Sequence, residues 1–365
     1  MLLIIGLFSL CINNNASAQE TSTEINKIKT AAEAGYAKAQ YEWAVKCYEG
    51  YENIKSDRIE AVKWWLKSAE QGFVEAQITV ASCYTEGIGV EKDYQKAKYW
   101  KLEAAKQGHP QAFIMLGEDY FMGRGVEKNP EMVFKSYELA DKFGSVEGTF
   151  RLGQCYMFAT GVERNLEEGI RLYKKAAEGG VKNAQTSLSL YYAVKENVDY
   201  NPQEAFKWAL VAAKNNVTEM QIYAGYYHLI GFGTVADEKE GLKYLVPIAK
   251  ANYEKISLKV TKLLVKYYTN KKNTVSAIPW IELAVEQGDE TYVEDLVHIY
   301  YKEYVKNDEA LAKWLKIGIA NGSSYCEAIQ GKILYDKGEK EEGLQLMKKA
   351  AADGDKTAKE MLKTI

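Results

Sequence analysis

A glycine or asparagine that recurs about every 36 residues constrains the fold of this chain more than any other feature. Ten such residues are separated by 32 to 37 positions, and six of the nine intervals are 36. These are the two residue types that best tolerate the left-handed conformation just past the end of a helix. The spacing therefore predicts a row of repeats, each of which ends in a helix. The ten residues are Gly35, Gly72, Gly108, Gly144, Gly180, Asn216, Asn252, Gly288, Gly322 and Gly354.

A second series of residues predicts where the last helix of each repeat begins. Fifteen positions before each terminator, eight of nine residues are Asp or Asn, which cap helix N-termini by accepting hydrogen bonds from free N–H groups. Pro130 and Pro202 follow two of these caps, at a position where proline is favoured. The caps are Asp57, Asp93, Asn129, Asn165, Asn201, Asp237, Asn273 and Asn307, with Glu339 as the exception. Capping boxes are expected from the glutamates three positions later, Glu60, Glu168, Glu204 and Glu240.

A glycine-rich turn separates this helix from an earlier one with the pattern A-Q-x-x-[LAV]-[GA]-x-x-Y, as at residues 76–84. The turn carries Gly87 and Gly89 in one repeat and Gly123 and Gly125 in the next. A phosphate-binding loop would follow a strand and carry Gly-Lys-Ser or Gly-Lys-Thr, and neither holds here. The glycines are therefore predicted to let the chain reverse between two helices.

Aromatic residues at one phase of the second helix predict a packing column. Five of the seven tryptophans lie eight positions before a terminator. The residues three positions before and four positions after the tryptophan position are mostly small and lie on the same helical face, so neighbouring helices can approach closely. The predicted column is Trp64, Trp100, Trp208, Tyr244, Trp280 and Trp314.

These motifs resemble the Sel-1-like repeat family, relatives of tetratricopeptide repeats with a longer G-x-G-V turn between the helices. The resemblance implies an all-α fold, a right-handed α-solenoid (superhelix) of about nine helix-turn-helix repeats. It is weakest at residues 253–288, and the repeat at 181–216 lacks the turn glycines. The predicted organisation is a signal peptide (1–18), a lead-in helix (19–35), repeats at 36–72, 73–108, 109–144, 145–180, 181–216, 217–252, 253–288, 289–322 and 323–354, and a closing helix (355–365).

The first eighteen residues predict export. An apolar run of twelve residues is too short to span a bilayer and leads to Ala16 and Ala18, an A-x-A cleavage pattern, although no Lys or Arg precedes it. We expect a periplasmic or secreted protein of a bacterium, without a membrane span once the signal is removed. Cys47, Cys83, Cys155 and Cys326 remain, and we expect free, buried thiols, with a Cys47–Cys83 disulfide left open.

Charge and motifs exclude several function classes. The 47 basic residues do not exceed the 50 acidic ones, so nucleic acid is not an expected partner. Three scattered histidines give no metal-site spacing. Some exported, cysteine-rich members of the family have been described as penicillin-binding, but this chain has no S-x-x-K, Ser-Asp-Asn, Lys-Thr-Gly or G-x-S-x-G motif. No catalytic residue, metal or cofactor is predicted.

The leading functional hypothesis is a monomeric scaffold that binds a protein or peptide in its concave groove. A cell-envelope accessory protein that contacts peptidoglycan or its enzymes is the alternative, and a β-lactam or cell-wall hydrolase is disfavoured. In tetratricopeptide-like solenoids the first helix of each pair lines the concave surface, so residues just off its core stripe are candidate contacts. They are Tyr41, Val45, Tyr48, Ile78, Ile114, Phe121, Phe150, Met157, Tyr226, Leu229, His298 and Tyr301.

Overall fold

The computed structural model describes residues 22–50, 55–251, 253, 255–302 and 305–365, and within these the regular structure is helical, without strands. The predicted signal peptide lies outside the described residues. The chain divides into two compact units, residues 1–200 and 201–365, which we describe separately.

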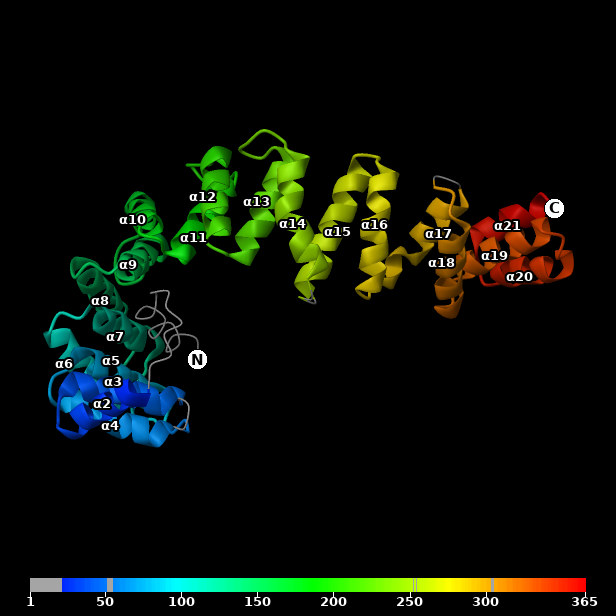
Figure 1. Ribbon diagram of the computed structural model, residues 1–365. Coiled ribbons are helices and arrows are strands. Elements are labelled where there is room, and N and C mark those ends of the chain that lie inside the picture. The colour runs from blue at the N-terminus through cyan, green and yellow to red at the C-terminus, as the bar shows by residue number, and fades with distance from the viewer. Residues whose placement is uncertain (1–21, 51–54, 252, 254, 303–304) are drawn as a thin grey trace. The chain divides into compact units, whose positions relative to one another are not determined.

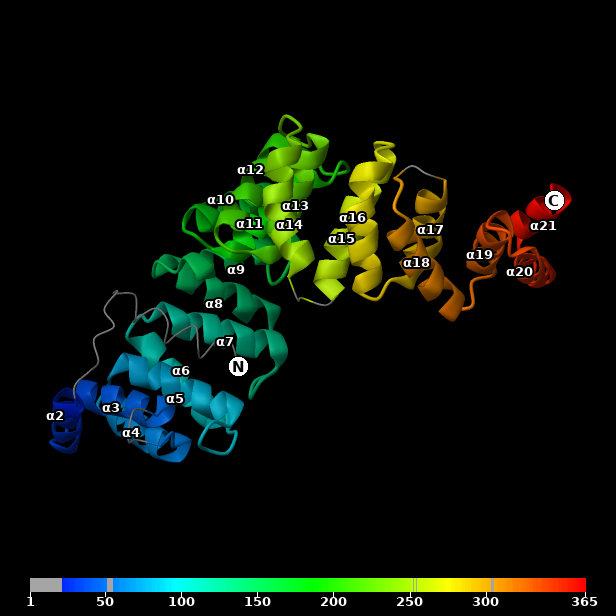
Figure 2. The ribbon, with the colours of Figure 1, turned by 45° about the vertical axis from the view of Figure 1, so that its right-hand side comes forward.

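The first unit is a stack of antiparallel helix pairs (Figures 1 and 2). Its helices are α2 (Ser22–Glu33), α3 (Ala37–Glu49), α4 (Arg58–Glu70), α5 (Val74–Glu86), α6 (Tyr94–Lys106), α7 (Pro110–Met122), α8 (Pro130–Lys142), α9 (Val146–Phe158), α10 (Leu166–Glu178) and α11 (Lys182–Ala193). Consecutive helices in this series pack against each other. Each repeat thus buries its apolar faces against its neighbours, as a solenoid does.

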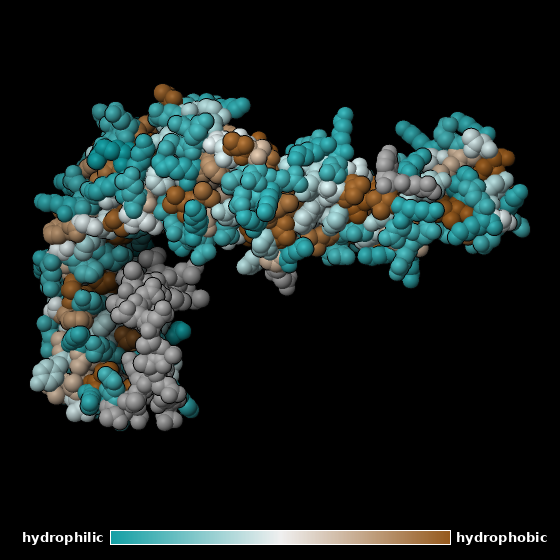
Figure 3. Space-filling view, turned by 45° about the horizontal axis from the view of Figure 1, so that its top comes forward, coloured by the Kyte–Doolittle hydropathy of each residue, from teal (hydrophilic) through white to brown (hydrophobic). Residues whose placement is uncertain are grey.

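The second unit continues the same pattern with shorter connections. Its helices are α12 (Pro202–Lys214), α13 (Thr218–Ile230), α14 (Glu238–Lys250), α15 (Lys255–Asn270), α16 (Thr274–Glu286), the 3₁₀ turn η1 (Glu290–Tyr292), α17 (Val293–Tyr301), α18 (Asp308–Ala320), α19 (Ser324–Asp336), α20 (Lys340–Ala352) and α21 (Lys356–Lys363). Only three residues, 271–273, separate α15 from α16. On the face that Figure 3 shows, hydrophilic residues predominate and hydrophobic ones form small patches.

The predicted helix boundaries are confirmed by backbone geometry. Nine of the ten terminators have positive φ, from 60° at Asn216 to 103° at Gly354, and the tenth, Asn252, lies outside the described residues. All eight predicted Asp and Asn caps accept a hydrogen bond from the first turn of their helix, as Asp57 does from Ile59 and Glu60. Glu339 makes no side-chain cap hydrogen bond.

The predicted capping boxes are wrong, and at three of the four positions the cap N–H is already used. The N–H groups of Asp57, Asn165 and Asp237 donate to carbonyl oxygens near the end of the preceding helix, at 2.7–3.0 Å. The glutamates bind their own helix instead, and Glu60 accepts from the Trp64 indole at 2.9 Å. The cap therefore also closes the turn between the two helices of a repeat.

The glutamine of the A-Q motif joins one repeat to the next. Gln77 Nε2 donates to the Ala69 carbonyl at 3.2 Å, and Gln185 donates to the Ala177 carbonyl at 3.0 Å. Both acceptors lie three residues before a terminator, where the last carbonyls of a helix lack partners within that helix. Each acceptor also takes the N–H of its terminator, so the motif adds a second hydrogen bond to a helix end across the repeat boundary.

The second glycine of the turn makes a close inter-repeat contact. Gly87 and Gly89 have φ of 75° and 67°, as a reversal requires. A Cβ at Gly89 would also collide with the Arg58 carbonyl at the start of the previous repeat's second helix. The same approach recurs at Gly125, Gly161 and Gly233, against Tyr94, Pro130 and Pro202. These glycines therefore set the distance between repeats as well as the turn.

The tryptophan column is only half buried, which corrects the prediction. Trp100, Trp208 and Trp314 are buried, whereas Trp64, Tyr244 and Trp280 are partly exposed. In the first repeat the neighbouring Trp65 is the buried ring. Two positions of the second helix are buried in every repeat, and they lie seven and four residues before the terminator; the former carries most of the large side chains. The position seven residues before the terminator holds Trp65, Lys101, Tyr137, Tyr173, Ala209, Leu245, Ile281, Leu315 and Met347.

The expected free cysteines are confirmed. Cys47, Cys83, Cys155 and Cys326 are all buried and unbridged, so the Cys47–Cys83 disulfide does not form. Burial raises the pKa of the Cys83 and Cys155 thiols to about 12, so they act as small apolar side chains. Among the described helices, none has both the length and the apolar character to cross a membrane.

A candidate partner-binding cleft in the first unit

One lysine occupies a position that is otherwise apolar or aromatic. Lys101, on α6, is 1% exposed and stands where Trp65 and Tyr137 stand in the adjacent repeats. A buried lysine is rare unless it is paired. The prediction from sequence missed it because the repeats were compared at the phase of the tryptophans, one residue earlier. The same comparison at the seventh position before the terminator reveals it.

Lys101 is paired with Asp119 on α7, eighteen residues later. Lys101 Nζ donates to Asp119 Oδ2 at 2.7 Å, and the two side chains are 2% and 4% exposed. The same offset links Trp65 to Cys83 and Tyr137 to Cys155, so an ion pair replaces an aromatic–cysteine pair here. Burial lowers the pKa of Lys101, and the Asp119 carboxylate opposes that shift.

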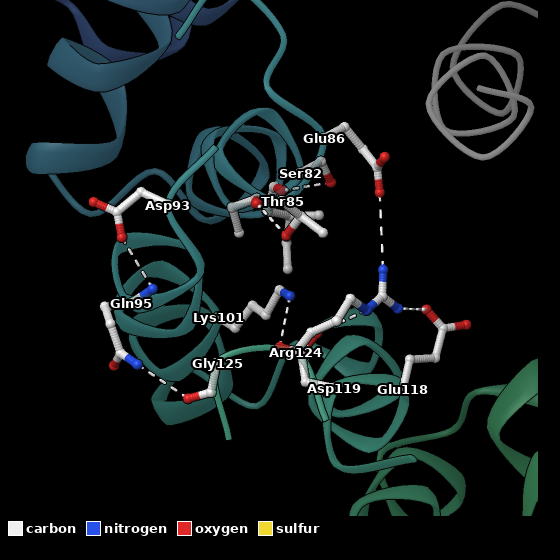
Figure 4. A network of polar contacts seen from close by, with 12 residues as sticks. Ser82, Thr85, Glu86, Asp93, Gln95, Lys101, Glu118, Asp119, Arg124 and Gly125 are labelled. Atoms are coloured by element: carbon white, nitrogen blue, oxygen red, sulfur yellow. Dashed lines mark hydrogen bonds and ion pairs between the residues drawn. The ribbon is translucent and has the colours of Figure 1, made fainter. Parts of the chain in front are cut away.

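Arg124 extends this pair to the surface, as Figure 4 shows. It lies in the turn after α7 and approaches three carboxylates: Asp119 at 3.6 Å, Glu118 at 3.7 Å and Glu86 at 3.8 Å. These distances allow charge attraction but exceed a hydrogen bond. The Nε atom is buried without a hydrogen-bond partner, while the side chain as a whole is 28% exposed.

Glu118 lies between two arginines from different repeats. Arg124 approaches it at 3.7 Å and Arg151, on α9, at 3.8 Å. Arg151 is held in turn by Glu147, which accepts from its Nε at 2.9 Å. Burial raises the pKa of Glu118, and both arginines oppose the shift. The arrangement places positive and negative side chains alternately along the first helices of neighbouring repeats.

Five of these residues line a cleft of about 580 Å³ bounded by α5, α7 and α9 and closed below by α6 and α8. Lys101, Arg124 and Arg151 contribute cations, and Glu86 and Glu118 contribute anions. Large apolar side chains stand at its edge in an exposed state: Phe121 at 54%, Met122 at 58% and Phe158 at 70%. A cleft of this size with apolar walls and few charged groups is typical of a binding site.

The twelve predicted contact residues differ in their exposure to solvent. Phe121, Tyr226 and His298 are exposed, and Tyr41, Val45, Tyr48, Met157 and Tyr301 are partly exposed. Four are buried and cannot meet a partner at the surface: Ile78, Ile114, Phe150 and Leu229. A helix position just off the core stripe is buried wherever the next helix packs closely, which the pattern alone does not reveal. Phe121 is the predicted residue that lines the cleft.

A second cleft, in the other unit, includes the predicted His298. It has a volume of about 610 Å³ and lies among α15, α16 and α17, with Lys262, Lys266 and Asp295 around it. His298 Nδ1 lies 3.1 Å from the Tyr325 hydroxyl. Its charged side chains are exposed and form no buried pair. In the described part of the chain, no three His, Cys, Asp or Glu residues are grouped as a metal site.

The repeats match a known family model. The Sel1 repeat model matches residues 37–73, 74–109, 110–139, 146–181, 183–217, 218–253 and 331–355. The chain therefore belongs to the Sel1 repeat family, whose members are generally protein–protein interaction scaffolds and whose solenoid fold is typically non-catalytic. No curated protein matches the chain.

Solved structures show the same fold. One is a protective antigen present in uropathogenic Escherichia coli strains, which displays an SLR fold. It is 27% identical, with a TM-score of 0.63 over 92% of this chain and 73% of that one. A Sel1 repeat protein from Oxalobacter formigenes is 24% identical, with a TM-score of 0.53 over 61% of this chain and 96% of that one.

Proposed function

We propose that the chain is an exported, non-catalytic scaffold that binds a segment of a partner protein in the cleft between α5, α7 and α9. Membership of the Sel1 repeat family supports protein binding. The apolar run and A-x-A pattern at residues 1–18 support export to the periplasm or beyond. The protein is monomeric in this proposal, and the partner is unidentified.

The exposed edge of the cleft is the observation that carries the proposal. Phe121, Met122 and Phe158 come from adjacent first helices and expose most of their apolar surface to solvent around a single hollow. Burying such side chains in a partner contributes about 25 cal/mol per Å² of apolar area. Aromatic residues and methionine are enriched at protein interfaces.

The test is capture of partners from envelope extract by the full chain. Phe121 and Phe158 are changed together to Ser, and the control changes Ile59 and Tyr99 to Ser, two comparably exposed apolar residues outside the cleft. A saturable partner that is lost with F121S/F158S but kept by the folded control supports the proposal. Capture that is unaffected by the cleft variant contradicts it. Binding to purified sacculi in place of a protein favours the peptidoglycan alternative.

A further inference from the structure

We propose that Arg124 selects the partner segment by binding a carboxylate, and that the buried Lys101–Asp119 pair is the positioning device that holds Arg124 in the cleft. The inference rests on the proposed function, because it concerns the same cleft. It identifies the partner chemistry as an Asp or Glu flanked by large apolar side chains.

Three departures from the repeat pattern meet at one point. Lys101 stands where other repeats have apolar or aromatic residues, and Asp119 stands where Cys83 and Cys155 occur. Arg124 is the middle residue of its G-x-G turn, where Ile88 and Phe232 stand in other repeats. An apolar replacement for a buried ion pair is often neutral or stabilising. The stability of the fold therefore does not explain why these three charges occur together, whereas a role in the cleft explains it.

The geometry divides the Asp119 carboxylate between two cations. Lys101 holds Oδ2 at 2.7 Å, and Oδ1, which has no hydrogen-bond partner among the described residues, faces Arg124 Nε at 3.6 Å. Lys101 thereby fixes the carboxylate from the buried side. Nε of Arg124 is held inward, so its terminal nitrogens point to the cleft, towards Glu86 and Glu118 (Figure 4).

The donors of Arg124 favour a carboxylate as the ligand. Glu86 and Glu118 already face this guanidinium, so a ligand carboxylate has to displace them. The contacts of Arg124 with Glu86 and Glu118 exceed hydrogen-bond length, which leaves its terminal donors available. A guanidinium binds a carboxylate through two parallel hydrogen bonds. Phe121, Met122 and Phe158 then pack against the flanking apolar side chains.

The probe is a displayed library of random twelve-residue peptides, selected on the full chain. Enriched peptides are expected to carry Asp or Glu between aromatic or aliphatic residues. One such peptide is then compared with its amide analogue, in which Gln or Asn replaces the acid. Hydrogen bonds to charged groups contribute enough for a preference of about tenfold to a hundredfold for the acid.

Three variants separate the roles. Arg124→Met should abolish the preference for the acid. K101M/D119C, with apolar residues found at these positions in other repeats, should stay folded with an unchanged or higher melting temperature and yet lose most of the preference. Arg171→Met, which removes an exposed arginine outside the cleft, should keep it.

Each outcome is decisive. A preference that survives Arg124→Met overturns the role of Arg124, and one that survives K101M/D119C overturns the positioning role. If the selected peptides carry no acid but binding is lost with F121S/F158S, the inference fails while the proposed function stands. If no peptide is selected, or if F121S/F158S binds normally, both fail.

Discussion

Two adjacent repeat junctions in the first unit are built from helices of equal length and have opposite chemistry. Between α6 and α7 lies the Lys101–Asp119 ion pair, and between α8 and α9 the equivalent residues are Tyr137 and Cys155. Both sets are buried. The solenoid thus accepts either solution at the same position, and its caps and glycine turns remain in place in both. The fold therefore does not dictate which residues occupy a junction, and function can determine them.

The largest expected effect comes from breaking the charged junction. Lys101→Met leaves the Asp119 carboxylate buried with only the distant Arg124, which should destabilise the fold by about 3–5 kcal/mol. The double change K101M/D119C removes both charges and should restore the wild-type midpoint or exceed it. Urea denaturation followed by circular dichroism measures both. Equal stabilities for the single and the double variant would show that the pair is not coupled.

Transplanting the pair tests the comparison in the opposite direction. Tyr137→Lys with Cys155→Asp places the ion pair in the apolar junction, where no arginine takes the place of Arg124 because Thr160 occupies that turn position. Desolvation of two charges should cost about 1–4 kcal/mol relative to the well-packed residues. The same denaturation assay applies. If the transplanted pair leaves the free energy of unfolding unchanged, the ion pair between α6 and α7 costs no stability. The positioning of Arg124 would then have no cost in stability to offset.

Gly117, on α7, packs against the tyrosine of the apolar junction, and its substitution should give a smaller effect. A Cβ at Gly117 would come within 2.6 Å of Cε1 of Tyr137, whereas the equivalent residues 36 positions earlier are Ala81 and Lys101. Gly117→Ala should therefore destabilise by about 1–3 kcal/mol through overpacking, despite the better helix propensity of alanine. Calorimetry would show a lower melting temperature. A higher one would mean that propensity outweighs the contact.

The smallest effect concerns Glu118 and pH. Burial raises the pKa of Glu118 in the folded state, so this group contributes stability below the unfolded pKa of about 4.3, and loses it as pH rises through the folded pKa. Glu118→Gln should match or slightly exceed the wild type at pH 7, by less than about 1 kcal/mol. Its advantage should shrink at pH 4. An advantage that grows as pH falls contradicts the assignment.

The sequence predicted best what local chemistry controls. Asn216 and the terminal glycines adopt positive φ, and the Asp and Asn caps accept the expected hydrogen bonds, because each depends on its own turn of helix. The capping boxes failed because a carbonyl from another helix takes the cap N–H of Asp57. The buried Ile78 and Phe150 were placed at the surface for the same reason, since burial depends on the neighbouring helix.

The cleft was the least predictable feature. Phe121 was identified from its helix position, but Phe158 and Met122 follow one residue later in the pattern and were not. Lys101 and Asp119 are eighteen residues apart on different helices, and no helical periodicity links them. Only a comparison of repeats at equivalent positions identifies both as unusual.

The close approach of Gly125 to Tyr94, and of Gly161 to Pro130, bears on how such a chain grows by duplication. Backbone atoms make much of this contact, so a copied segment fits beside its parent without matched side chains. The Lys101–Asp119 pair imposes a different condition, because its halves belong to successive repeats. A recombination boundary between residues 101 and 119 would leave an orphan charge on either side. Exchange of whole repeats is thus permitted at most boundaries and penalised at this one.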